Sequence, residues 1–330
     1  RSTKAPLRFS GWSLRRICSP ASAKLALALL LLLASASVAE SEEAPRFVGT
    51  AENPDELLAV IGSARSRSFK PVGHTSVVLR MRTVARVTAA MKVRSRAVPR
   101  GYQYEIAAYR ISRLLQMDNV PPAISRRVRW REIRQRFHEE MLGRRGSVRR
   151  KILWDDDDSA PGAAIYWVRG MRSVGLEDVP RWAAWVSDGE IPEGRRILAR
   201  DLSTMAVFDM LIGNWDRFSG GNFPTDASRT RALLRDNDRG FSTPLLEGRY
   251  EKLLSRLSAT ERFSRSLVDR LTALDEEAIR NELGRDPGHA VEPLLSDRQI
   301  RDVMARRATI LSHIAALVQE RGVDEVLVFP

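Results

Sequence analysis

The sequence predicts an α+β fold of two lobes, a small strand-rich lobe followed by a mainly helical one. Two runs with strand character, 75–82 and 86–93, come first and are followed by an amphipathic helix over 102–117. A long apolar helix over 195–212 and a helical pattern from Leu245 onward occupy the second half. The chain has 330 residues, 43% of them apolar, which is enough to bury the core of such a fold.

Residues 1–39 have the features of an export signal peptide. Basic residues without any Asp or Glu precede an apolar core and a run of small residues, "KLALALLLLLASASVAE". The apolar core is too short for a membrane span, so we predict cleavage after Ala39 and a secreted or periplasmic protein without a stable membrane span. An uncleaved anchor is the alternative. Cys18, the only cysteine, lies in this segment, so the mature protein would form no disulfide.

The charge distribution does not favour a nucleic-acid partner. The formal net charge is +13, but six of these charges lie in the leader, and the others are spread through segments of mixed sign. One Arg-rich segment, 126–151, is predicted to be polar and helical. It supports the alternative of a basic envelope protein that binds polyanions.

The first lobe is predicted over 71–170, after a lead-in segment over 40–70. The lead-in contains a short helix, "NPDELLAVIGSA", with Asn53 or Asp55 near its N-cap. In the strand over 86–93, Ala90 and Lys92 share one face because side chains alternate along a strand. The following helix carries Glu105 on its flank and ends at "VPP", since proline cannot continue a helix.

The second lobe is predicted over 171–330, and a buried strand, "AAIYWVRG", leads up to it. The segment "RALLR" over 231–235 is predicted to be a short strand between two polar loops. The acidic run "WDDDDS" before the first of these strands could bind calcium, but it lacks the glycine and the distant glutamate of an EF-hand loop. It is therefore interpreted as a solvated turn. The four histidines show no metal-ligand spacing.

Several polar residues stand in the order that phosphoryl transfer from ATP requires. That reaction needs a cation on the phosphates, a carboxylate that orients this cation, metal ligands, and a carboxylate at the acceptor hydroxyl. Lys92 is the candidate cation, and Ala90, two residues earlier, leaves room for an adenine ring. Glu105 is the candidate partner of Lys92. If each residue is considered alone, the alternative is that Lys92 is a solvated lysine on an edge strand and that Glu105 is a solvated glutamate.

Two polar loops supply the remaining parts. Asp216, in "GNWDRF", is the candidate catalytic carboxylate, and Asn222 offers an amide oxygen to a metal ion. Asp236 opens "DNDRGF" directly after the predicted short strand, where it could bind metal, and Asp238 is a spare carboxylate beside it. Ordinary polar turns are the alternative for both loops. The succession as a whole is that of a two-lobed protein-kinase-like fold.

Three segments of the chain resemble a known family. "MKVRSRAVPRGYQYEIAAYRISRLLQMDNVPPAI", "FDMLIGNWDRF" and "RDNDRGF" are similar to segments of the secretory-pathway kinases of the Golgi casein kinase group. The resemblance implies that Lys92 and Glu105 form an ion pair, that Asp216 is catalytic, and that Asp236 binds Mn²⁺ or Mg²⁺ with ATP. It also implies that "PGAAIYWV" leads to the hinge between the lobes.

The chain departs from the family pattern at several positions. Phe218 stands where the family often has His, Asp238 replaces a glycine, and the loop between Asp216 and Asn222 is one residue longer than in protein kinases. A glycine-rich phosphate loop of the usual pattern is missing. The turn "VGHTSVV", through Gly73, Thr75 and Ser76, is the candidate that covers the phosphates, although it could equally be the plain start of a hairpin.

We therefore expect an exported, ATP-dependent kinase that transfers the γ-phosphoryl group to a hydroxyl, first of a protein Ser or Thr and second of a saccharide. The lengthened loop and Phe218 leave open a pseudokinase that binds nucleotide and regulates a partner.

Overall fold

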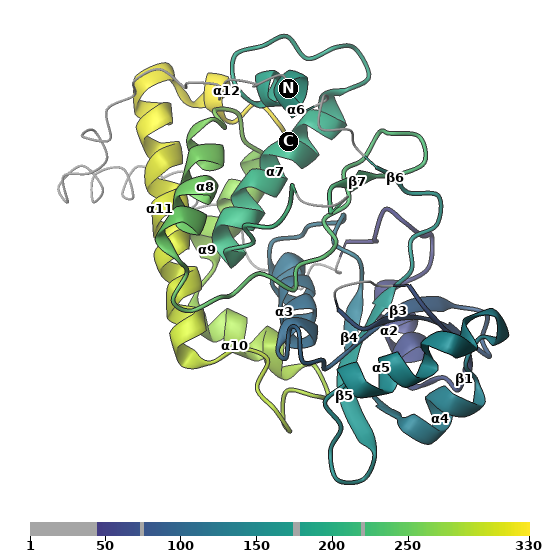
Figure 1. The fold of residues 1–330 in the computed structure, drawn as a ribbon. Helices are drawn as coiled ribbons and strands as arrows, with labels where there is room; N and C mark the ends of the chain where they lie inside the picture. Colours follow the sequence, from purple (N-terminus) through teal and green to yellow (C-terminus); the bar gives the residue numbers. More distant parts are fainter. Residues whose placement is uncertain (1–44, 73–75, 174–178, 219–221) are drawn as a thin grey trace, which may run out of the picture.

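The computed structural model describes residues 45–72, 76–173, 179–218 and 222–330 (Figure 1). The predicted leader with its cleavage site, and Gly73 and Thr75 of the predicted phosphate turn, lie outside the described residues. A strand-rich part and a helical part lie side by side, which confirms the predicted α+β architecture. Within the described part of the chain, no helix has the length and apolar character needed to cross a membrane.

The strand-rich lobe is built on a five-stranded antiparallel sheet with the order β1-β2-β3-β5-β4. Neighbouring strands are paired in a register that sets Lys92 opposite Val78 on one side and Ala163 on the other. Ala90 lies opposite Ile165 and shares this face. The strands are β1 (Ser66–Pro71), β2 (Val78–Thr83), β3 (Thr88–Val93), β4 (Ala123–Arg129) and β5 (Ser159–Tyr166).

Strand β1 falls in the segment that was expected to be a lead-in. It pairs with β2, and helix α2 (Pro54–Ser63) before it contacts β4 and β5, so both belong to the packed lobe. The N-cap of α2 is Asn53, as expected, and its side chain accepts hydrogen bonds from the backbone N–H groups of Asp55 and Glu56. The polar residues of β1 do not show the alternation that predicts a strand. Ser66, for example, is buried and donates a hydrogen bond to Glu132.

The prediction of a helix from residue 126 was wrong at its start. Residues 123–129 form β4, which pairs with β5 along its whole length, and helices follow only from Trp130. Arg126 and Val128 face inward, whereas Arg127 and Arg129 face solvent, so the side chains alternate as in a strand. Because Arg126 is charged, its inward position is not apparent from the sequence. The Arg126 guanidinium is buried because it donates to the carbonyls of Ile61 and Ala64. The helices are α4 (Trp130–Gln135), η2 (Glu139–Arg144) and α5 (Arg145–Lys151).

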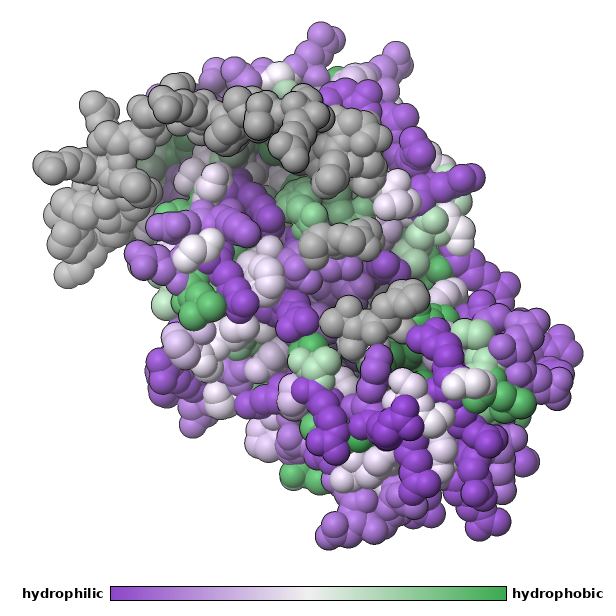
Figure 2. All heavy atoms as spheres, viewed as in Figure 1, coloured by the Kyte–Doolittle hydropathy of each residue, from purple (hydrophilic) through white to green (hydrophobic). Residues whose placement is uncertain are grey.

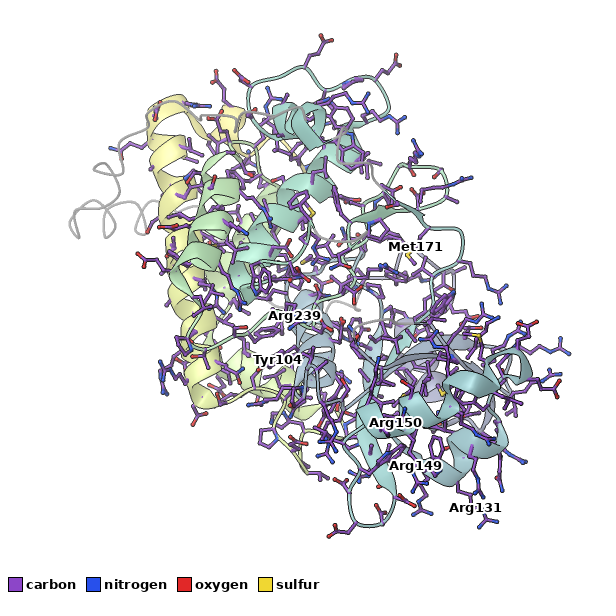
Figure 3. All side chains as sticks on the ribbon, viewed as in Figure 1. Tyr104, Arg131, Arg149, Arg150, Met171 and Arg239 are labelled. Atoms are coloured by element: carbon purple, nitrogen blue, oxygen red, sulfur yellow. The ribbon has the colours of Figure 1, made fainter. Side chains whose placement is uncertain are left out.

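Arginine side chains of this helical segment cover part of the strand-rich lobe. Arg131, Arg149 and Arg150 are exposed there (Figure 3), and the visible face of the lobe is mainly hydrophilic (Figure 2). The acidic run before β5 lies nearby, and Asp155 forms ion pairs with Arg94 and Arg127. These arginine partners agree with the interpretation of the acidic run as a surface turn.

Helix α3 (Gly101–Leu114) packs on the sheet and joins it to the second lobe. Arg110 of α3 lies 3.4 Å from Glu282 and 3.8 Å from Asp286, and all three side chains are buried. Tyr102 donates a hydrogen bond of 2.7 Å to Glu292. These polar contacts fix the orientation of the helix that carries Glu105.

The helical lobe packs around α7 (Arg196–Ile212), which contacts α6, α8 and α11. Helix α7 ends at Gly213, whose φ of 72° is the left-handed conformation that favours glycine at this position. Helix α11 starts with a capping box between Ser296 and Gln299. The other elements are β6 (Arg172–Ser173), α6 (Val179–Val186), β7 (Pro224–Thr225), α8 (Glu247–Ser258), α9 (Arg265–Ala273), α10 (Glu276–Gly284), α11 (Asp297–Arg321) and α12 (Val323–Val326).

Two strand predictions around the site need correction. The segment 231–235 forms no regular strand: Ala232 makes a single bridge to Thr225, and Leu234 donates to the carbonyl of Asn119. Its buried leucines gave it strand character, but its backbone bonds go to different partners instead of one ladder. The strand predicted at 163–170 begins earlier, at Ser159, and ends at Tyr166.

Candidate active site

Lys92 and Glu105 form a buried ion pair between the sheet and α3. The Lys92 Nζ lies 2.6 Å from Glu105 Oε1, and both side chains are about 5% exposed or less. Strand β3 sets Lys92 on the face that α3 covers, and Glu105 lies in the second turn of that helix. The structure thus brings together the two residues that the sequence paired.

The loop after Leu234 brings two more carboxylates to the same ammonium group. Asp236 Oδ1 and Asp238 Oδ2 each lie 2.9 Å from Lys92 Nζ, and the backbone N–H of Asn237 donates to Glu105 Oε2 at 3.0 Å. Asp236 adopts φ 57°, a left-handed conformation that Asp tolerates better than most residues. We call Lys92, Glu105, Asp236 and Asp238 the lysine cluster.

The charges of the lysine cluster shift its pKa values. Burial acts to lower the pKa of Lys92, but the charges of Asp236, Glu105 and Asp238 outweigh it and raise this pKa well above the ordinary value. The charge of Lys92 lowers the pKa of Asp236 to about 2. Burial raises the pKa of Glu105 despite the nearby ammonium. One ammonium thus contacts three carboxylates, and two guanidinium groups lie farther off: Arg235 is 3.9 Å from Asp236 Oδ2, and Arg239 is 4.0 Å from Asp238 Oδ1.

The convergence of three carboxylates suits a divalent cation. One oxygen atom each of Glu105, Asp236 and Asp238 lies within 4.8 Å of the others, and carboxylate oxygens are ligands that Mg²⁺ and Mn²⁺ prefer. The Asp236 side chain is 35% exposed and is therefore open to the cleft. The donor set fits the predicted metal.

Asp216 and Asn222 meet after the end of α7, where the structure describes residues 213–218 and 222–223, which we call the Asp216 loop. The Asn222 Nδ2 donates to the backbone carbonyl of Asp216 at 3.3 Å and to its Oδ2 at 3.4 Å. Asn214 links this loop to the lysine cluster: its Oδ1 accepts from the backbone N–H of Asp216, and its Nδ2 donates to the carbonyl of Asp236. The two predicted polar loops therefore lie side by side.

A fully buried arginine holds the two loops together. Arg217 donates to Asp209 through Nε and Nη2, at 2.8–3.2 Å, to Asn237 Oδ1 at 2.7 Å, and to the carbonyls of Asn222 and Arg235. We call Arg217, Asp209 and Asn237 the arginine cluster. No role was expected for these residues from the sequence. Asp209, within the apolar stretch "MAVFDMLI" of α7, was the available indication, since a buried acid requires a partner.

A cavity of about 240 Å³ opens beside the lysine cluster. Ala90, Val78 and Ile165 form an apolar wall, in agreement with the expectation that Ala90 leaves space for a flat ring. Tyr166, Trp167 and Val168 continue the wall after β5, where the hinge was expected. Met171 also borders the cavity and lies between the two lobes in Figure 3.

The described part of the predicted phosphate turn lies at the edge of this cavity. Ser76 lies two residues before the start of β2, and Val72 and Val78 on either side of the turn line the cavity. On the opposite side, Tyr104 of α3 packs against Phe241 of the "DNDRGF" loop, with ring centroids 5.8 Å apart. Figure 3 labels Tyr104 on α3 and Arg239 of the "DNDRGF" loop near this helix.

Comparisons with known proteins agree with this architecture. The chain is 24% identical to human glycosaminoglycan xylosylkinase over 264 residues, 68% of this chain and 62% of the relative. It thus spans about three fifths of that protein's length. No known family model matches the chain.

Solved structures share the fold. A Golgi casein kinase with Mn and ADP bound superposes with a TM-score of 0.61 at 18% identity, over 83% of this chain and 78% of that one. A hydra Fam20 protein with sugar gives a TM-score of 0.62 at 15% identity, over 86% and 95%. The chain therefore has the two-lobed kinase-like fold of these structures, and the comparisons confirm its resemblance to the Golgi casein kinase group.

Proposed function

We propose that the chain is an ATP- and metal-dependent kinase that transfers the γ-phosphoryl group to a hydroxyl of a protein or a glycan. The observation that carries this proposal is the lysine cluster beside an apolar cavity. A cation, its carboxylate partner and further acidic oxygens converge there at the end of a space bordered by Ala90 and Ile165.

Each residue has a defined task in this proposal. The cavity holds the adenine ring, and Lys92, oriented by Glu105, contacts the phosphate oxygens. Asp236 is the principal metal ligand, and Asn222 and Asp238 lie on the loops beside it. The bound Mn²⁺ or Mg²⁺ supplies neutralisation of charge on the β- and γ-phosphates. Asp216 accepts the proton of the attacking hydroxyl.

The acceptor is a hydroxyl of one of two classes. The sequence favours a protein Ser or Thr first, and the name of the human relative adds xylose of a glycan. Phe218 stands two residues after Asp216, where the family often has histidine, and its ring packs against Phe223 and the Arg256 guanidinium. We infer that the acceptor differs in shape from that of members with histidine. The predicted export signal supports a reaction in a secretory or periplasmic compartment.

Transfer of labelled phosphate tests the proposal. The purified chain is incubated with γ-labelled ATP and Mn²⁺, with casein and a xylosylated glycan as separate acceptors. We expect label on one acceptor, reduced about 10²- to 10⁴-fold in Asp216→Asn and lost in Asp236→Asn. Asp155→Asn, which changes a surface acid, serves as the matched control and retains activity. Equal labelling by all variants would refute the assignment.

A pseudokinase remains the second candidate, because one observation favours it. Three carboxylates already surround Lys92, and Asp238 adds a negative charge where phosphate would bind. Nucleotide binding that depends on metal, without transfer to either acceptor, would support this alternative. An affinity for heparin that ATP does not change and that falls steeply with salt would instead support the alternative of a polyanion-binding protein.

A further inference from the structure

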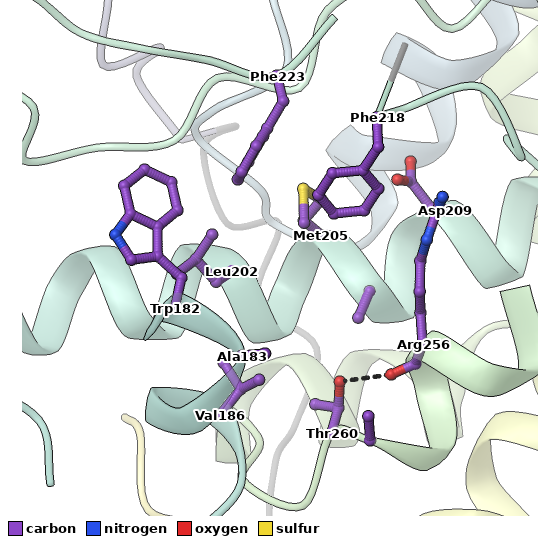
Figure 4. A pocket seen from close by; sticks show the side chains of 12 residues that line it. Trp182, Ala183, Val186, Leu202, Met205, Asp209, Phe218, Phe223, Arg256 and Thr260 are labelled. Carbon is purple, nitrogen blue, oxygen red and sulfur yellow. Dashed lines mark hydrogen bonds between the residues drawn. The ribbon is translucent and has the colours of Figure 1, made fainter. Parts of the chain in front are cut away.

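A second cavity lies among α6, α7 and α8, where Phe218 and Phe223 of the Asp216 loop also line it (Figure 4). Its volume is about 340 Å³, within the range of sites for small molecules. Trp182, Leu202, Met205, Phe218 and Phe223 form most of its wall. The rings of Trp182 and Phe223 meet edge to face at 5.4 Å, as do those of Phe218 and Phe223. This wall suits the apolar body of a ligand.

Arg256 of α8 supplies a positive charge at one end of this wall. Its guanidinium lies 4.2 Å from the centre of the Phe218 ring, a cation–π contact. Its Nη1 is buried and has no hydrogen-bond partner among the described residues. Burial lowers the pKa of Arg256. The charge of Asp209, which also lines the cavity, opposes this shift. A buried donor without a hydrogen-bond partner is costly, so Nη1 is available to an acceptor on a ligand.

The other polar groups of the cavity are already engaged. Both carboxylate oxygens of Asp209 accept from Arg217. The Thr260 hydroxyl donates to the backbone carbonyl of Arg256 at 3.0 Å, as the dashed line in Figure 4 shows. Arg256 is therefore the group that can recognise the polar end of a ligand.

We propose that this cavity binds a small amphipathic carboxylate, with its apolar body against Trp182, Leu202 and Phe223 and its head group on Arg256. A guanidinium and a carboxylate match in charge and in planar geometry, which makes them a strong pair in a site of low polarity. The residues of this site differ from those of the nucleotide cavity, with which it shares no lining side chain.

Binding of octanoate to the intact protein tests the inference without ATP, so the result is independent of kinase activity. Tryptophan fluorescence reports binding, because Trp182 lines the cavity. We expect a saturable change with octanoate and about tenfold weaker binding of octanamide, which has the same chain without the charge. The comparison of the two probes needs no substitution. Equal affinities, or no response to octanoate at millimolar concentration, would overturn the proposal.

Two arginines of α8 provide a matched pair of variants. Arg256→Met should weaken octanoate binding about tenfold or more, because it removes the head-group partner and keeps an apolar stem. Arg249→Met should not change it, since Arg249 stacks on Trp215 instead, at 4.0 Å. Ala206→Leu, which fills part of the cavity, should also weaken binding. Thermal unfolding verifies that each variant is folded, and unchanged affinity in folded Arg256→Met would contradict the site.

Discussion

The lysine cluster and the arginine cluster lie on either side of the same short segment, Asp236 and Asn237, yet their charges are balanced differently. In the arginine cluster, one buried guanidinium meets one buried carboxylate, and its remaining donors go to neutral oxygens. In the lysine cluster, one ammonium meets three carboxylates. The first is satisfied by close hydrogen bonds within the chain, whereas in the second the further cations, Arg235 and Arg239, approach their carboxylates only to 3.9–4.0 Å.

This difference separates a structural role from a ligand-binding role. A buried pair that satisfies itself holds backbone segments in place, and nothing further is needed for its stability. A cluster in which three carboxylates share one ammonium keeps carboxylate oxygens available to a cation, and titratable groups with shifted pKa values are common at functional sites. The proposed metal would bind these oxygens of the lysine cluster.

The largest effect on stability is expected in the arginine cluster. Arg217→Met leaves the Asp209 carboxylate buried without its partner, so we expect a loss of about 3–5 kcal/mol in the free energy of unfolding. Urea unfolding followed by tryptophan fluorescence measures it. Arg249→Met, at a cation stacked on an indole ring, is the control and should cost far less. A loss below about 1 kcal/mol for Arg217→Met would show that the cluster is not structural.

Metal addition should act on the lysine cluster alone. Mn²⁺ at a hundred times its Kd should raise the free energy of unfolding by about 2.7 kcal/mol, and EDTA should reverse the gain. Asp236→Asn should abolish the gain because it removes the most accessible carboxylate of the cluster. The same Mn²⁺ titration with this variant is the control. A gain of equal size in both proteins would place the metal elsewhere.

A smaller effect of the opposite sign is expected for Asp238→Asn without metal. Removing one of three carboxylates relieves their mutual repulsion, so the free energy of unfolding should stay the same or rise by about 1 kcal/mol. The Mn²⁺-induced gain should shrink in the same variant. If Asp238→Asn instead lost more than about 1 kcal/mol, the third carboxylate would be a structural partner of Lys92.

The smallest effect is expected at the acidic turn before β5. Asp155 pairs with Arg94 and Arg127 at the surface, where water screens the charges. Asp155→Asn should therefore cost at most about 1 kcal/mol and leave the response to Mn²⁺ unchanged. Added Ca²⁺ should not stabilise the protein either. Stabilisation by Ca²⁺ that Asp155→Asn removes would contradict the surface-turn interpretation.

Residues with a local sequence pattern were predictable. The alternation along β3 set Lys92 on one face, and the helical period of α3 set Glu105 thirteen residues later on the adjoining element. The N-cap at Asn53 was predictable for the same reason, since capping depends on nearest neighbours. The approach of Asp236 to Lys92 followed from the order of the motifs and the family resemblance.

Features that depend on distant partners were not predictable. The strand β4 was not predicted because it contains the buried Arg126. The hydrogen-bond acceptors of Arg126 are carbonyls about sixty residues earlier, at Ile61 and Ala64. The role of Arg217 needed Asp209 and Asn237, which come from a helix and from another loop. The convergence of Asp238 on Lys92 also required the fold, because a spare carboxylate in a turn is ordinarily solvated.

Diffraction from crystals grown with Mn²⁺ and a non-hydrolysable ATP analogue tests the central claim most directly. The account predicts an anomalous manganese peak at Asp236, with the adenine ring beside Ala90 and a phosphate oxygen on Lys92. Nucleotide bound elsewhere, or manganese only at surface acids such as Asp155, would contradict it.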